Sequence, residues 1–159
     1  MGFEIEYKYK VASEDWQEGV RRAVHMRQGY FETADDSTVR VRLVEPVDPA
    51  DGAEPAGELT IKGRPSGGVR PEFEYTIPPE DVERMLELFC GDRQVQKVRH
   101  YVDHAGHEWV VDVFEGRHEG LVLAEIELDA PDEAYAEPDW IGEDVTGDRS
   151  FTNAALARE

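Results

Sequence analysis

Charged side chains recur at every second position in short segments spread along the sequence. Residues 3–11 read FEIEYKYKV, so Glu4, Glu6, Lys8 and Lys10 alternate with apolar or aromatic residues. Clustered carboxylates bind hard divalent cations through oxygen, and clustered guanidinium and ammonium groups bind polyanions. Six further segments repeat the alternation, with the charged residues Arg40, Arg42, Lys62, Arg64, Glu72, Glu74, Lys97, Arg99, Glu108, Asp112, Glu125 and Glu127. Brought together, these residue types could form a metal–polyphosphate site.

An alternation of period two predicts β-strands. Eight strands are expected, at residues 3–11, 26–33, 38–45, 58–64, 70–77, 94–102, 108–115 and 121–128. Amphipathic helices are expected between them, from Ser13 to about Ala23 and over residues 78–91. A short acidic helix after Pro131 and a last helical turn or two in the tail SFTNAALARE complete the predicted elements.

These elements predict a mainly β fold of the α+β class. Strands joined by hairpin-length links favour an antiparallel sheet, and eight strands are enough to close a barrel. Either the apolar faces lie inside with the charges in water, or the charges lie inside with the apolar faces covered by helices. The amphipathic helices favour the second arrangement, because the apolar side of each helix must pack against an apolar surface. The charges inside would then need one another, water, a metal ion or a charged ligand.

Length and charge narrow the class of protein. The 159 residues fit a single domain, residues 1–159. The formal charge of −19, from 36 acidic and 17 basic residues, argues against a nucleic-acid or membrane partner. Because no apolar run is long enough to span a membrane and no secretory leader is found, a cytoplasmic protein is expected. Cys90 is expected to pack in the core. The chain would act on a small molecule, either alone or as a homodimer.

The spaced motifs resemble the triphosphate tunnel metalloenzymes of the CYTH superfamily. EIEYK matches the Glu-x-Glu-x-Lys motif, and RQGY, TVRVR, LTIKG, RPEFE, KVRHY, VDVFEG, GLVLAEIEL and WIGEDVTGDRSFTN follow in order over nearly the whole chain. The resemblance implies a closed eight-stranded antiparallel barrel, with helices packed outside. Its charged tunnel would bind a triphosphate with Mg²⁺ or Mn²⁺. Short bacterial members of this kind are similar to inorganic tripolyphosphatases.

The resemblance also implies residue roles. The metal would be held by Glu4, Glu6 and Glu127, with Glu125 and Asp112 in support. The phosphates would contact Lys8, Arg40, Arg42, Lys62, Lys97 and Arg99, and Glu72 and Glu74 would be tunnel acids or hold a second metal. Lys97 and Glu6 would be the catalytic residues, with Lys97 acting as a base for the attacking water or as a fixed positive charge. Tyr30 would gate a tunnel mouth or pack at the barrel end, and the tail with Asn153 would close that end.

The implied reaction is metal-dependent hydrolysis of tripolyphosphate to pyrophosphate and phosphate. Thiamine or nucleoside triphosphates are alternative substrates. A class IV adenylate cyclase would need a nucleobase pocket, which the sequence does not locate. A non-catalytic polyphosphate or nucleotide sensor would need the cationic residues but not the acidic residues that bind metal. A lipocalin-like barrel for an apolar ligand would have its charged face outside. The chain departs from the resemblance at Tyr7, where an Arg is common, and at Val110, where an acid is common.

Overall fold

Nine antiparallel strands form one sheet in the computed structural model, which describes residues 5–64 and 70–159. The strands are β1 (Ile5–Val11), β2 (Val20–Tyr30), β3 (Thr38–Pro46), β4 (Ala56–Lys62), β5 (Glu72–Ile77), β6 (Gln94–His104), β7 (His107–Phe114), β8 (Val122–Leu128) and β9 (Ile141–Asp144). They pair in the order β5-β4-β3-β2-β6-β7-β8-β1-β9. The predicted mainly β, antiparallel fold is confirmed.

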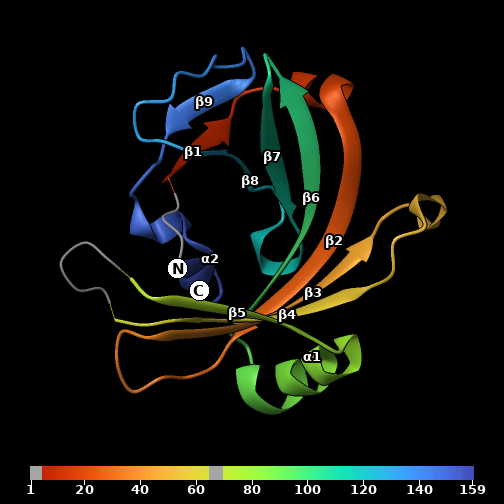
Figure 1. Cartoon of the computed structure of the whole chain (residues 1–159), viewed down its shortest axis with the longest axis vertical. Helices are drawn as coiled ribbons and strands as arrows, with labels where there is room; N and C mark the ends of the chain where they lie inside the picture. The colour runs from red at the N-terminus through yellow and green to blue at the C-terminus, as the bar shows by residue number, and fades with distance from the viewer. Residues whose placement is uncertain (1–4, 65–69) are drawn as a thin grey trace.

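The sheet curls but does not close by strand pairing. Figure 1 shows it bent like a C, with β1 and β9 at the upper left, β5 at the bottom and α2 between them. Within the described residues, β5 and β9 are the two edge strands, so the expected closed eight-stranded barrel is corrected to an open sheet of nine. Strand β9, which was not predicted, pairs with the side of β1 that does not face β8. In a closed barrel the backbone groups on that side of β1 would pair with another strand of the barrel, but here β9 satisfies them.

The predicted strands lie near their expected positions, and the main error concerns β2. The helix expected from Ser13 to about Ala23 is wrong. A single 3₁₀ turn, η1 (Asp15–Gly19), replaces its first part, and β2 begins at Val20. Residues 24–29 of β2 pair with β3 on one side and with β6 on the other, and residues 20–23 continue the pairing with β6. The strand conformation therefore satisfies the backbone groups of β2 that face β6.

The helices are short. The helix expected over residues 78–91 is confirmed as α1 (Pro79–Met85) followed by a π-helical turn, η3 (Leu86–Cys90). The tail forms η5 (Arg149–Phe151) and α2 (Asn153–Leu156), while η2 (Pro49–Asp51) and η4 (Gly116–His118) are single 3₁₀ turns. Within residues 5–64 and 70–159, none of these helices has the length and apolar character needed to cross a membrane.

The acidic helix expected after Pro131 is not formed. That segment is a turn followed by irregular chain. The Glu133 carboxylate accepts a hydrogen bond from the Asp129 backbone N–H (2.8 Å) and contacts His107 Nε2 (2.9 Å). Glu133, which would lie on the expected helix, therefore stabilises a turn instead.

Apolar clusters cover the outer face of the sheet. Val41 and Leu43 of β3 pack against Val82, Leu86 and Cys90, and all five are buried. Because successive side chains of a strand point to opposite faces, Arg40 and Arg42 lie on the inner face of β3. Helix α1 lies below β3 to β5 in Figure 1. The arrangement with charge inside and helices outside is thus confirmed here, as is the packing role of Cys90.

Two more clusters complete the packing. Trp109, on the outer face of β7, is fully buried and contacts the rings of Tyr9, Tyr135 and Trp140 at centroid distances of 5.9, 5.9 and 5.7 Å. The second, called the end cluster, lies at the α2 end and consists of Tyr30, Val95, Phe114, Leu123, Val145, Leu156 and Ala157. Outer aromatic packing and the end cluster thus hold the curled sheet in shape.

Gly29 marks a close approach between β2 and η3. A Cβ at this position would lie 2.6 Å from Leu86 Cδ2 and 2.7 Å from Cys90 Sγ. We expect Gly29→Ala to lower the free energy of unfolding by about 1–3 kcal/mol through overpacking, measured by urea denaturation. In a Leu86→Ala background the same change should cost less because the nearest atom is gone. An equal cost in both backgrounds would contradict the close packing of η3 on β2.

Candidate active site

The inner face of the sheet lines a cavity of about 540 Å³. The predicted site residues that line it are Glu6, Lys8, Tyr30, Arg40, Arg42, Lys62, Glu72, Glu74, Arg99, Glu125 and Glu127. The lipocalin-like alternative, with the charged face outside, is therefore wrong. Lys97 and Asp112 lie buried behind this wall, with relative exposures of 0% and 1%. Glu4 lies outside the described residues, and Arg64 is exposed near Asp36.

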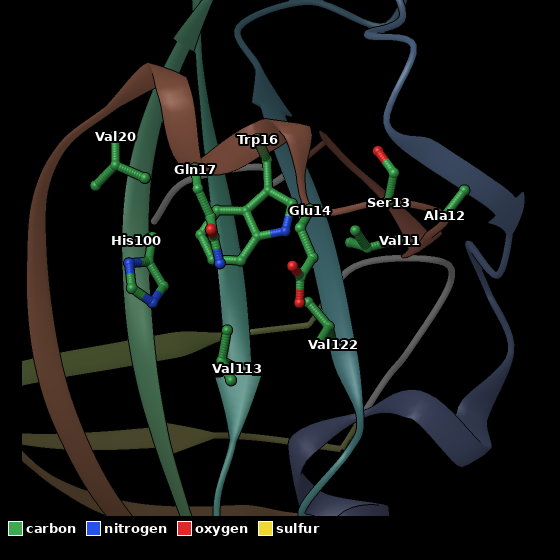
Figure 2. Close-up of a pocket in the computed structure, with 10 residues that line it drawn as sticks. All are labelled: Val11, Ala12, Ser13, Glu14, Trp16, Gln17, Val20, His100, Val113 and Val122. Atoms are coloured by element: carbon green, nitrogen blue, oxygen red, sulfur yellow. The ribbon is translucent and has the colours of Figure 1, made fainter.

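A second pocket, of about 640 Å³, lies on the outer face. Figure 2 shows the Trp16 indole, His100 and several valines around it. Glu14 lines this pocket, and neither Lys nor Arg is among the described residues that do so. A polyanion would meet apolar surface and a carboxylate there, so the inner cavity is the candidate site for anion chemistry.

Two arginines of β3 form a cationic wall of the inner cavity. Arg42 Nε donates a hydrogen bond to Gln28 Oε1 (3.0 Å), and Arg40 Nη2 donates one to Thr60 Oγ1 (2.9 Å). The buried Arg40 Nε has no acceptor within the described part of the chain. Burial lowers the pKa of Arg42 to about 10, which leaves its guanidinium charged at neutral pH. This wall can therefore offer hydrogen bonds and positive charge to an anion.

Asp112 lies between two cations and ties β7 to β6. Arg99 donates two hydrogen bonds to its carboxylate, from Nε to Oδ1 (2.8 Å) and from Nη2 to Oδ2 (2.9 Å). Lys97 Nζ also donates to Oδ2 (2.9 Å). One carboxylate thus serves two positive charges, and its bidentate pair with Arg99 has the geometry of a strong ion pair.

Burial and this imbalance together set the protonation of the three groups. Burial raises the pKa of the Asp112 carboxyl, but Lys97 and Arg99 outweigh burial and hold that pKa well below its usual range. Burial lowers the pKa of Lys97 to about 7, because Asp112 offsets burial only in part and Arg99 and Arg42 repel the ammonium. The pKa of Arg99 is lowered by burial but raised more by Asp112 and Glu125. Lys97 is therefore the member of the trio that can release a proton near neutral pH.

The wall formed by β1 and β8 carries paired acids. Glu6 lies directly opposite Glu127, and Lys8 lies opposite Glu125, with Lys8 Nζ 3.1 Å from Glu125 Oε1. Within residues 5–64 and 70–159, no three His, Cys, Asp or Glu side chains are grouped to enclose a metal ion. Mg²⁺, however, commonly binds one or two carboxylates and completes its octahedron with phosphate oxygens and water. The Glu6–Glu127 pair fits a metal ion that binds together with a phosphate.

The end of the cavity next to α2 contains Tyr30 and Asn153. Tyr30 belongs to the end cluster, and its Oη accepts a hydrogen bond from Gln28 Nε2 (3.1 Å), so it is packed at this end. Asn153 lines the cavity and accepts a hydrogen bond from Lys97 Nζ through Oδ1 (3.2 Å). The tail motif with Asn153 predicted closure of the barrel end, but nothing local to the motif indicated Lys97 as the partner of Asn153. Arg70 also lines the cavity and was not predicted. Glu108, a member of the charge alternation to which no role was assigned, lines it as well.

Comparison with known proteins places the chain in a family. The family model described as the CYTH domain matches residues 2–152. The chain belongs to the CYTH domain family. This CYTH chain is similar to the inorganic triphosphatase of Acetivibrio thermocellus, with 39% identity over 158 residues that cover 99% of this chain and 95% of the relative. It is also similar to the inorganic triphosphatase of Nitrosomonas europaea, with 35% identity over 157 residues, 97% of this chain and 96% of the relative.

A solved structure supports the fold of this CYTH chain. The crystal structure of an inorganic triphosphatase matches it with a TM-score of 0.71 and 32% identity, over 100% of this chain and 97% of the other. The predicted family is thus confirmed in both sequence and fold.

Removing the shared carboxylate of the CYTH cavity should destabilise the fold. Asp112→Asn would leave Lys97 and Arg99 buried without their anion, so we expect it to lower the free energy of unfolding by about 3–5 kcal/mol at pH 7, measured by urea denaturation. The matched control is Asp103→Asn, since Asp103 pairs with Arg21 at the surface (3.1 Å) and should contribute less than about 1 kcal/mol. Equal losses for the two variants would contradict the role of Asp112 as a buried counter-charge.

Proposed function

We propose that this chain is a metal-dependent triphosphatase that hydrolyses inorganic tripolyphosphate to pyrophosphate and phosphate in the inner cavity. The observation that carries the proposal is the concentration of cations there. The protein has 17 Lys and Arg residues against 36 acids, yet the cavity is lined by Lys8, Arg40, Arg42, Lys62, Arg70 and Arg99. A compact, highly charged anion is the ligand that such a wall fits. The names of the two curated relatives support the same substrate.

The arginines would bind the phosphates from β3 and β6. The buried Arg40 Nε is a donor without an acceptor among residues 5–64 and 70–159, and leaving such a group unpaired is costly, so a phosphate oxygen would satisfy it. Gln28 holds the Arg42 guanidinium, and Asp112 holds that of Arg99. Because these groups are fixed before the substrate arrives, little ordering is required of them on binding. The substrate would therefore be held extended between two prearranged walls.

We propose Mg²⁺ or Mn²⁺ as the cofactor, with Glu6 and Glu127 as ligands and Glu125 beside them. When bound, such an ion neutralises phosphate charge and favours attack at phosphorus. The supporting observation is the direct pairing of Glu6 with Glu127 on the cavity wall. Glu72 and Glu74 line the cavity from β5, where they would act as tunnel acids or hold a second ion. Lys62 Nζ lies 3.9 Å from Glu72 Oε1 and would balance part of that charge.

In hydrolysis, water attacks the terminal phosphorus, the bond to the bridging oxygen breaks, and pyrophosphate leaves. Lys97 would support this step from behind the wall, because its ammonium is fully buried and donates to Asp112 and Asn153. A bound polyanion would favour the protonated form of Lys97, so a positive charge is the role that this placement favours once substrate is bound. Direct proton abstraction would require Lys97 to reach past Asn153 to the water.

The test of the proposed function is phosphate release from tripolyphosphate, pyrophosphate, ATP and thiamine triphosphate, each with Mg²⁺, Mn²⁺ or chelator. We expect metal-dependent release from tripolyphosphate and a loss of about 10- to 100-fold in kcat/KM for Glu6→Gln, because the substitution removes a metal ligand. Glu143→Gln is the control, since Glu143 pairs with Lys10 on the surface (3.0 Å). Tight tripolyphosphate binding without release would favour a sensor, and absence of both would overturn the proposal.

A second variant tests the link between Lys97 and the cavity. Asn153→Ala removes an acceptor of Lys97 Nζ, so we expect kcat for tripolyphosphate to fall about tenfold while KM changes less than about twofold. Thr152→Ala is the control: its hydroxyl caps α2 by accepting from the Ala155 N–H (3.2 Å), so this change loosens α2 without removing the Lys97 contact. Equal losses in the two variants would show that Asn153 acts only by holding α2.

A further inference from the structure

The pocket of about 640 Å³ on the outer face, called the outer pocket, has an apolar floor and an aromatic wall. Val113 and Val122 lie directly opposite each other in the β7–β8 register, both line the pocket, and both are half-buried. The Trp16 indole, only 5% exposed, forms the wall. Small-molecule sites have volumes of this order and combine a mainly apolar lining with a few polar groups. The shape and lining of the outer pocket therefore fit a small organic ligand.

Three polar side chains at the outer pocket have hydrogen-bonding capacity to spare. Glu14, Gln17 and His100 line the pocket, and their side chains form no hydrogen bond or ion pair with any residue in the ranges 5–64 and 70–159. In Figure 2 the Glu14 carboxylate and the Gln17 amide are seen on either side of the Trp16 indole. The polar groups that would orient a ligand are thus present and not used by the fold.

The charges at the outer pocket favour a cation. Glu14 lines the pocket without any Lys or Arg among the described lining residues. The His100 ring packs against the Trp16 indole, with centroids 4.8 Å apart, and burial lowers the pKa of His100, so its imidazole is neutral at pH 7. The formal charge of −19 on the whole chain also attracts cations to its surface. An ammonium group here could pair with Glu14 and interact with the π-face of the indole.

We propose that the outer pocket binds a small organic cation, namely a protonated amine attached to a flat apolar ring. The ammonium pairs with the Glu14 carboxylate, while the ring packs between the Trp16 indole and the floor formed by Val113 and Val122. Gln17 and His100 offer further hydrogen bonds to the ligand. The outer pocket shares no lining residue with the inner cavity, so this site is separate from the proposed triphosphatase site and does not depend on it.

The test is a titration of the full chain, followed by two-dimensional NMR at pH 7 and low salt, where ion pairs are least screened. Tryptamine, tryptophol and indole-3-propionate carry the same ring and linker but end in a cation, a neutral group and an anion. Ethylamine has the cation without the ring. We expect tryptamine to bind about 3- to 30-fold more tightly than tryptophol, the combined range for an exposed ion pair and a cation–π contact. Indole-3-propionate and ethylamine should bind most weakly, and tryptamine should shift the Trp16 indole N–H signal.

Substitutions on exposed residues keep the fold and test the ion pair. Glu14→Gln should weaken tryptamine binding by about 2- to 5-fold and leave tryptophol binding nearly unchanged. Glu18→Gln is the matched control, because Glu18 is an exposed acid of η1 that does not line the pocket, and it should leave both affinities nearly unchanged. Gln17→Lys supplies a competing ammonium, so it should weaken tryptamine binding and strengthen binding of indole-3-propionate.

Four results would overturn the proposal. They are equal affinities for the three indole ligands, equal losses for tryptamine in Glu14→Gln and Glu18→Gln, signal shifts confined to residues of the inner cavity, and no saturable binding of tryptamine. A concentration-dependent dimer that Gln17→Lys dissociates would also overturn it, because a second copy of the chain would then cover the pocket.

Discussion

The inner face of this sheet depends on one buried carboxylate. Asp112 receives two hydrogen bonds from Arg99 and one from Lys97, while Arg42 adds a third positive charge nearby. Burying ions that are not paired costs several kcal/mol each, so without Asp112 these cations could not be held together out of water. Glu125 Oε2 lies 3.7 Å from Arg99 Nη2 and adds a second, more distant negative charge. Burial is the main cause of the lowered pKa of Lys97, and Asp112 offsets burial only in part.

A charged inner face moves the hydrophobic core to the outside of the curled sheet. Trp109, Tyr9 and Trp140 pack on one part of the outer face, and Val41 and Leu43 pack under α1 and η3 on another. Stability and chemistry are therefore largely assigned to opposite faces of the same strands. Asp112 is the exception, because it stabilises the fold through the same ion pairs that organise the cavity.

The C-terminal segment bridges β1 and β6, two strands of the curled sheet, at one end of the cavity. Lys8 Nζ donates to the carbonyl oxygen of Phe151 (3.2 Å), and the Lys8 backbone N–H donates to Thr146 Oγ1 (2.9 Å). A few residues later, Asn153 receives a hydrogen bond from Lys97 on β6. The segment thus contacts β1 and β6, which are separated by two strands in the sheet, and closes one end of the cavity. Because β9 and these side-chain contacts hold β1 in place, the sheet does not need strand pairing between its β9 edge and its β5 edge.

From the amino-acid sequence alone we could predict the strand pattern, the segregation of charge from apolar residues, the family, and most of the residues that line the cavity. These features are local, since the alternation within one strand states which side chains share a face. The folded structure was needed to show that residues from Val20 onward extend β2, that β9 occupies the edge of β1, and that Lys97 and Asp112 lie behind the wall. It was also needed to find the contact of Asn153 with Lys97 and the pairing of Tyr101 with Val110. Such contacts depend on the strand register and on the curvature of the sheet, which bring together segments that are distant in the chain. The residue pattern within one segment therefore does not predict them.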